Sequence, residues 1–180
     1  HEEEEDITDI FDHTEEASAD VAQIPGEAPD ITQVKAMRKD QSACFFGPNV
    51  IKICQAADIV FMALHGENGE NGKIQAAFDL FGIRYTGTGY LSSALAMDKE
   101  MSKKLFLSAG IPAPKGASMK KADCSDDITK LGIQFPCVVK PCCGGSSIGV
   151  SIAHNAEEYK AALDEAFRWE ENLIVEEYVK

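Results

Sequence analysis

The stretch FPCVVKPCCGGSSIGV (residues 135–150) decides the fold of the second half of this chain. A short β-branched run ends at Lys140, a loop of glycines and serines follows, and residues 148–152 form a second apolar run. The pattern predicts a strand, a flexible loop and a returning strand, with a lysine at the mouth of the loop. Glycine N–H groups and serine hydroxyls suit a phosphate, although an ordinary hairpin with a glycine-serine turn explains the stretch equally well. The lysine precedes the glycines, so this is not a Walker A loop.

The residues around this stretch predict a β-α-β-loop-β-α-β order. Residues 115–119 are typical of a strand, and residues 125–128 begin a short helix with acids in its first turn. Asn155 and Glu158 match a capping box, and an apolar helical face follows them. Residues 172–179 predict a last strand that carries Glu176 and Glu177 on opposite faces.

The first half predicts one parallel βαβ unit. Residues 58–64 form a continuous apolar run of the kind found in buried parallel strands. An amphipathic helix is expected over residues 74–81, ending at Gly82, and a strand over residues 83–85. His65 follows the first strand, at the end where functional loops gather, although a lone histidine there is more often structural than catalytic.

A further helix is predicted between the two halves, over residues 92–109. Asp98 can cap within it, and Lys99 leaves near its start. Considered alone, Lys99 is an ordinary solvated lysine. Residues 110–114 stop the helix and form an extended linker.

Composition excludes some classes of function. The formal net charge is −13, but residues 1–30 hold twelve acids and no base, and the remaining 150 residues hold eighteen acids against seventeen bases. No basic stripe is left to bind nucleic acid. No apolar run reaches the length of a membrane span, and nothing at the start suggests secretion. Residues 1–34 are expected to form an acidic surface segment, with one turn of helix around Ile7, Ile10 and Phe11.

The six cysteines show neither C-x-x-C nor zinc-finger spacing. Scattered reduced thiols in a cytoplasmic protein are therefore expected. The chain begins with histidine, so we expect a fragment, a processed form or an expression product of a longer protein.

Several short motifs, in their order and spacing, resemble the D-alanine–D-alanine ligase family of the ATP-grasp superfamily. The resemblance covers about residues 56–180, and the motifs are ALHG (63–66), GENGKIQ (69–75), YTGTG (85–89), ALAMDK (94–99), GIPAP (110–114), VVKP (138–141), GSSIGV (145–150) and VEEYV (175–179). It implies an α/β fold, α+β in the second half. Residues 1–95 would form an incomplete N-terminal parallel βαβ domain, and residues 96–180 a truncated central ATP-grasp subdomain.

The resemblance also implies residue roles in a ligase that joins two D-alanines with ATP, through an acyl phosphate, for peptidoglycan precursors. Lys99 and Lys140 would hold the nucleotide phosphates, and the loop carrying Ser146 and Ser147 would close over them. Ser146 would also serve the catalytic site by organising the dipeptide. The adenine and ribose would be held by Glu176, Glu177 and Val179, and the first D-alanine would lie beside His65.

The family is dimeric, so a homodimer is implied for the whole protein. The Mg²⁺ ligands and a transition-state arginine are expected beyond Lys180, and the family's first strand before His1. The 180 residues alone are therefore expected to be inactive. Gly144 departs from the larger residue that many members carry, which puts one loop contact in doubt. A D-alanyl-D-lactate or D-alanyl-D-serine ligase, another ATP-grasp ligase, or a non-catalytic nucleotide-binding module remain as alternatives.

Overall fold

The computed structural model describes residues 11, 26–27, 29–39 and 41–180. The predicted turn around Ile7 and Ile10, and most of the acidic segment 1–34, lie outside these residues. The chain separates into two compact units, one of residues His1–Met62 and Phe78–Thr86 and one of residues Ala63–Ala77 and Gly87–Lys180. The domain boundary near residue 95 stays a prediction.

In the first unit, the predicted pair of parallel strands is reduced to a single bridge. Val60 pairs in parallel with Tyr85, which agrees with a βαβ order. The run 58–64 is otherwise irregular, and Phe61 is 79% exposed, so its prediction as a buried strand was wrong. Among the described residues, no further strand pairs with this run, so its apolar side chains are left uncovered. Two short helices, α1 (Ile31–Ala36) and α2 (Val50–Ala56), precede it.

The predicted amphipathic helix is present as α3 (Lys73–Leu80). Ile74 and Phe78 are buried, as their spacing indicates. Gly82 adopts a left-handed φ of 66°, and the N–H of Ile83 donates to the carbonyl of Phe78. A glycine ends this helix because it enters the left-handed region without a Cβ penalty.

The helix predicted over residues 92–109 is instead two helices, α4 (Tyr90–Met97) and α5 (Lys99–Ser108). Asp98 separates them with an extended backbone (φ −87°, ψ 105°), and its side chain accepts from the N–H of Met101. Asp98 therefore caps, as predicted, but it starts a second helix rather than continuing the first. An aspartate that bonds its own following turn competes with the helical ladder before it.

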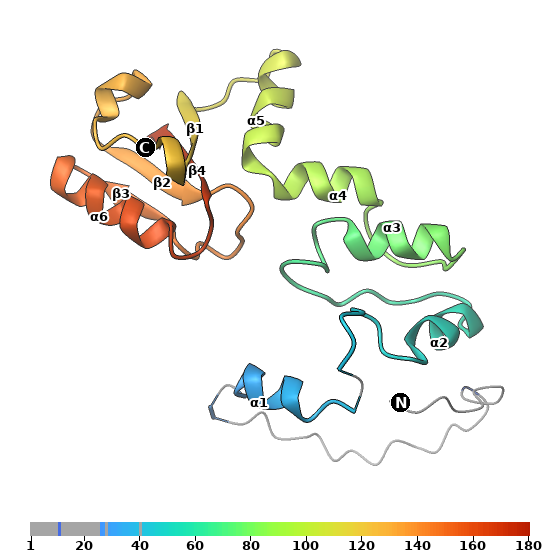
Figure 1. The fold of residues 1–180 in the computed structure, drawn as a ribbon. Coiled ribbons are helices and arrows are strands. Elements are labelled where there is room, and N and C mark those ends of the chain that lie inside the picture. Colours follow the sequence, from blue (N-terminus) through green and yellow to red (C-terminus); the bar gives the residue numbers. More distant parts are fainter. Residues whose placement is uncertain (1–10, 12–25, 28, 40) are drawn as a thin grey trace. The chain divides into compact units, whose positions relative to one another are not determined.

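A four-stranded antiparallel sheet organises the second unit (Figure 1), in the order β1-β4-β2-β3. The strands are β1 (Gly116–Lys120), β2 (Cys137–Pro141), β3 (Ser151–Ala153) and β4 (Asn172–Glu177). Two 3₁₀ turns, η1 (Lys121–Asp123) and η2 (Ile128–Leu131), connect β1 to β2, so the predicted short helix lies slightly later than expected. The glycine-serine loop joins β2 to β3, as predicted.

Helix α6 (Ala156–Ala166) covers one face of this sheet (Figure 1). The side chain of Asn155 accepts from the N–H of Glu158, and Glu158 in turn accepts from the N–H of His154 and the amide of Asn155. The predicted cap is therefore confirmed. The helix buries its apolar face against the inward residues of the strands, and the fully buried members of this core include Tyr159, Leu163, Val139, Leu173 and Val175. Because side chains alternate along a strand, Lys140 and Glu176 lie on the opposite face of the sheet.

Candidate functional site

Strands β2 and β4 place Lys140 and Glu176 on one face of the sheet. Glu176 lies opposite Val138 in the antiparallel register, and Lys140 is two residues further along β2. Residues two apart on a strand share a face, and diagonal neighbours are within reach of a long side chain. The Nζ of Lys140 lies 2.5 Å from Oε2 of Glu176. The fold thus joins Lys140, predicted to hold the phosphates, to Glu176, predicted to hold the adenine and ribose.

Helix α5 carries Lys99 and Lys103, which share a side of the helix because they are four residues apart. Lys103 places its Nζ 2.8 Å from Oε1 of Glu176. Each oxygen of this carboxylate therefore has its own ammonium partner. Sequence reasoning missed Lys103, and the i, i+4 spacing from Lys99 was the signal that could have found it.

Glu176 is buried, with 9% of its side chain exposed. Burial alone would raise its pKa, but hydrogen bonds and charge attraction from Lys103 and Lys140 together hold the pKa below its ordinary value. A buried carboxylate stays ionised only where such partners compensate for lost hydration. The three side chains therefore form a charged cluster.

Lys99 fastens the base of the glycine-serine loop to α5. Its backbone N–H donates to the carbonyl of Cys142 at 3.0 Å, and its Nζ lies 3.2 Å from the same oxygen. The ammonium also donates to the carbonyl of Gly144. The Lys99 side chain thus contacts the glycine-serine loop, which is predicted to bind phosphate, and is not a free surface lysine.

The loop itself turns through left-handed backbone. Ser146 and Ser147 have φ values of 51° and 59°, and Gly149 has 69°. Left-handed serines are uncommon and are held only where their surroundings require it. The loop closes with hydrogen bonds from Ile148 to the carbonyl of Gly145 and from Val150 to that of Ser147. Both serines are exposed.

Two residues after α6 hold the loop from the other side, and sequence reasoning missed both. The carboxylate of Glu170 accepts from the N–H of Cys143 at 2.8 Å. A Cβ on Gly149 would lie 2.9 Å from Trp169 and 3.0 Å from Pro141, so this glycine leaves room for close packing. The loop is therefore anchored near both of its ends.

The remaining predicted site residues do not join the charged cluster through any hydrogen bond or ion pair that the structure describes. The side chain of His65 is 95% exposed, with Nδ1 4.0 Å from Glu70. Glu177 uses Oε1 to accept from the N–H of Lys115, which holds the start of β1 to the end of β4. Val179 is 64% exposed. The roles given to these residues, as to Lys99, Lys140, Ser146, Ser147 and Glu176, stay predictions.

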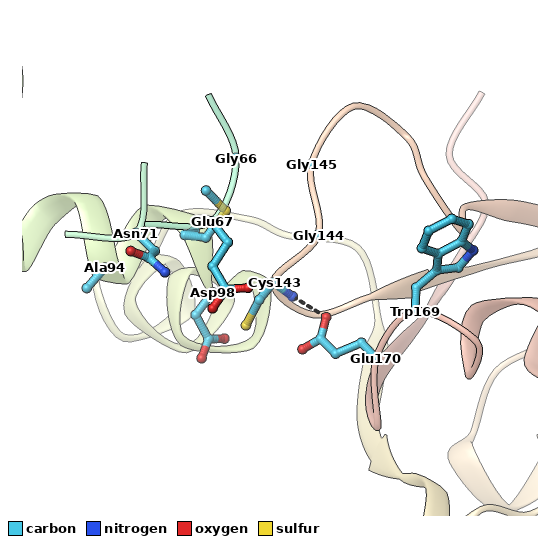
Figure 2. A pocket seen from close by; sticks show the side chains of 11 residues that line it. Gly66, Glu67, Asn71, Ala94, Asp98, Cys143, Gly144, Gly145, Trp169 and Glu170 are labelled. Carbon is cyan, nitrogen blue, oxygen red and sulfur yellow. Dashed lines mark hydrogen bonds between the residues drawn. The ribbon is translucent and has the colours of Figure 1, made fainter. Parts of the chain in front are cut away.

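A pocket of about 490 Å³ lies beside the loop (Figure 2). Its lining comes from the 66–71 loop, the end of α4, the loop after β2 and the residues after α6: Gly66, Glu67, Asn71, Ala94, Met97, Asp98, Cys143, Gly144, Gly145, Trp169 and Glu170. The charged cluster does not line it. Trp169 and Glu170, which hold the glycine-serine loop from one side, thus also form part of the wall of this pocket.

The adjacent thiols Cys142 and Cys143 are poor nucleophiles. Burial, with the negative charge of Glu170 second, raises the pKa of Cys142 to about 12 and that of Cys143 to about 11. Only the thiolate attacks or binds metal readily. All six cysteines are free, so the structure agrees with the expected reduced thiols.

The described part of the chain brings together no three residues of the types that ligate metals. No described helix combines the length and the apolar character needed to cross a membrane.

Comparison with known proteins shows the family of this chain. The family model described as "D-ala D-ala ligase N-terminus" matches residues 5–88, and "D-ala D-ala ligase C-terminus" matches residues 105–180. Proteins named D-alanine–D-alanine ligase from Lacticaseibacillus casei and Pediococcus pentosaceus are 48% and 46% identical, over 81% of this chain and 40% and 41% of their own lengths. The chain thus spans about two fifths of these relatives.

Solved structures agree. The D-alanine–D-alanine ligase of Bacillus anthracis complexed with ATP matches with a TM-score of 0.65 and 36% identity, over 73% of this chain and 44% of that one. The VanG D-Ala:D-Ser ligase of Enterococcus faecalis matches with a TM-score of 0.64 and 38% identity, over 69% and 37%. The sheet, its glycine-serine loop and these likenesses define an ATP-grasp protein. Within that class, the chain belongs to the D-alanine–D-alanine ligase family.

Proposed function

We propose that a full-length protein carrying these residues joins two D-alanines into D-alanyl-D-alanine with ATP, for peptidoglycan synthesis. The reaction would pass through an acyl phosphate on the first D-alanine, which the amine of the second attacks. Family membership supports the reaction. The observation that carries the role of this chain is the Lys140–Glu176–Lys103 cluster beside an anchored glycine-serine loop.

The two predicted phosphate ligands come from separate elements, Lys99 from α5 and Lys140 from β2. Ammonium groups on separate elements can follow negative charge as it moves from the transferred phosphoryl group to the leaving nucleotide. Lys99 already donates to loop carbonyls. Closure of the loop over the phosphates would therefore move the lysine and the loop together.

The loop would exclude water, which would otherwise hydrolyse the acyl phosphate. Ser146 and Ser147 supply exposed hydroxyl donors on a turn whose base is held by Lys99 and Glu170. Hydroxyls on an anchored turn are suited to the phosphates, and Ser146 would also orient the forming dipeptide.

The adenine and ribose would lie along the end of β4. Glu176 is ionised and each of its oxygens keeps a further lone pair, so it can accept from the 6-amino group of adenine. The backbone near Val179 continues beyond the strand and can read the base edge, and Glu177 can accept from ribose hydroxyls. His65, exposed beside Glu70, would contact the first D-alanine.

A divalent cation such as Mg²⁺ supplies charge neutralisation in phosphoryl transfer. The described residues do not form its ligand set. We propose that the 180 residues alone synthesise no dipeptide.

The test is ADP release by the full-length protein with ATP, D-alanine and Mg²⁺. Lys140→Ala should abolish most of the D-alanine-dependent release, while Lys160→Ala, an exposed lysine of α6, should leave it intact. Absence of D-alanine-dependent release from the wild type would refute the proposal. Dipeptide formation by the 180-residue chain would refute its inactivity.

One observation supports a second candidate function, the joining of D-alanine to D-serine. The D-Ala:D-Ser ligase structure is 38% identical to this chain, as is a D-alanine–D-alanine ligase structure from Bacillus anthracis. Competition between D-alanine, D-serine and D-lactate for the second position, measured across pH, separates these specificities. A cytoplasmic location and a homodimer, which cell fractionation and light scattering test, complete the proposal.

A further inference from the structure

The side chain of Lys103 lies largely enclosed beside Glu176, a predicted nucleotide ligand. Its side chain is 12% exposed, and its ammonium lies 2.8 Å from Glu176, 73 residues further along the chain. Neighbouring Lys104 is 63% exposed and pairs with Glu100 on its own helix. Lysines are rarely buried without a compensating partner. Lys103 is thus directed inward, at the same carboxylate that Lys140 contacts.

The strand beside it leaves space for this ammonium. Gly116 pairs with Glu176 in the register of β1 and β4. A Cβ on Gly116 would lie 2.7 Å from Nζ of Lys103, 2.7 Å from Cγ of Glu176 and 2.5 Å from the carbonyl of Val175. The absence of a side chain at Gly116 therefore lets Lys103 reach Glu176.

The contact between Lys103 and Glu176 changes the net charge of the cluster. Lys140 and Glu176 alone would form a neutral pair, because one carboxylate offsets one ammonium. Of the two lysines that contact Glu176, Lys140 is the more exposed. Lys140 is 25% exposed, against 12% for Lys103. With Lys103 bound to the other oxygen, the three side chains carry a net charge of +1.

We propose that Lys103 is a positioning residue for nucleotide binding. By holding one oxygen of Glu176, it orients that carboxylate and leaves the positive charge of Lys140 available to the polyphosphate of a nucleotide. Lys103 acts through Glu176 and does not touch the nucleotide. The inference rests on the proposed function, because it takes Lys140 and Glu176 as nucleotide ligands.

The experiment measures ATP affinity of the full-length protein by calorimetry, together with the KM for D-alanine. Lys103→Met keeps most of the aliphatic stem and removes the ammonium group. It should weaken ATP binding about tenfold, because Glu176 would lose the partner that orients it and would offset the charge of Lys140 alone; losses of this size are usual when one member of a contacting charged network is removed. The KM for D-alanine should stay unchanged, whereas a general loss of structure would alter both. Lys104→Met is the matched control and should bind ATP as the wild type does.

A double-mutant cycle with Glu176→Gln tests the route of the effect. If Lys103 acts through Glu176, then Lys103→Met should weaken ATP binding by less than about threefold in the Glu176→Gln background. An equal loss in both backgrounds, or no loss in the wild-type background, overturns the inference while the proposed function stands. If Lys103→Met alone fails to fold, the ATP affinity of Glu176→Gln is compared with that of the double variant. A loss greater than about threefold between them overturns the inference. A wild type that binds no ATP refutes the proposed function, and the inference with it.

Discussion

Gly149→Ala is expected to destabilise the second unit more than a glycine substitution ordinarily does. The residue has a φ of 69°, where an L side chain costs about 1–2 kcal/mol. Its new Cβ would also lie 2.9 Å from Trp169 and 3.0 Å from Pro141, and such overpacking costs about 1–3 kcal/mol. Because the two penalties act at one site, the free energy of unfolding should fall by about 2–5 kcal/mol.

The assay is urea denaturation of the 180-residue chain, followed by the fluorescence of Trp169, its one tryptophan. Two matched controls separate the penalties. Gly132→Ala has a φ of 67° and open space, so it should show the backbone penalty alone. Gly145→Ala has neither a positive φ nor a close neighbour and should be nearly neutral. If Gly149→Ala and Gly132→Ala lose the same stability, Trp169 does not pack on the loop and the reasoning is wrong.

Three further outcomes are expected. Leu163→Ala empties a site that is 2% exposed and should lower the free energy of unfolding by about 2–5 kcal/mol, while Leu107→Ala, 54% exposed, should change it by under about 0.5 kcal/mol in the same urea assay. The pKa of Glu176 is lower in the folded than in the unfolded chain, so the unfolded chain binds more protons at pH values between the two. The stability that Glu176 contributes is therefore complete above the unfolded pKa of about 4.3, and it is lost as the pH falls through the folded pKa. Glu176→Gln should flatten that acid decline in urea midpoints measured across pH, and an unchanged slope would contradict the ion-pair cluster. Cys143, with a pKa raised to about 11, should alkylate slowly at pH 8, and Glu170→Gln should speed the reaction, as followed by mass spectrometry; equal rates would exclude Glu170 as a cause.

Local patterns predicted the elements whose cause is local. The face of α6 was predicted from helical periodicity, its start from Asn155 and Glu158, and the end of α3 from Gly82. Each depends on residues within a few positions of one another, since caps and amphipathic faces involve only neighbouring turns. The strand-loop-strand around Lys140 was predicted on the same basis.

Local patterns failed where neighbours in space decide. The run 58–64 was predicted as a buried strand because it is apolar, yet burial requires partner strands, and the described residues supply only the bridge from Val60 to Tyr85. The break at Asp98 was missed because apolar spacing continues across it, while the capping bond to Met101 starts a new helix.

The sequence by itself determined that a lysine precedes a glycine-serine loop, that a glutamate pair closes the last strand, and that the motif order resembles one ligase family. The tertiary structure alone decided what these residues contact. Antiparallel register sets Lys140 diagonal to Glu176, and α5 brings Lys103 to the other oxygen through the space left by Gly116. Trp169 and Glu170 likewise reach the loop from beyond α6. The physical reason is that a buried charge needs partners of opposite sign, and a fold can supply them from any distance along the chain.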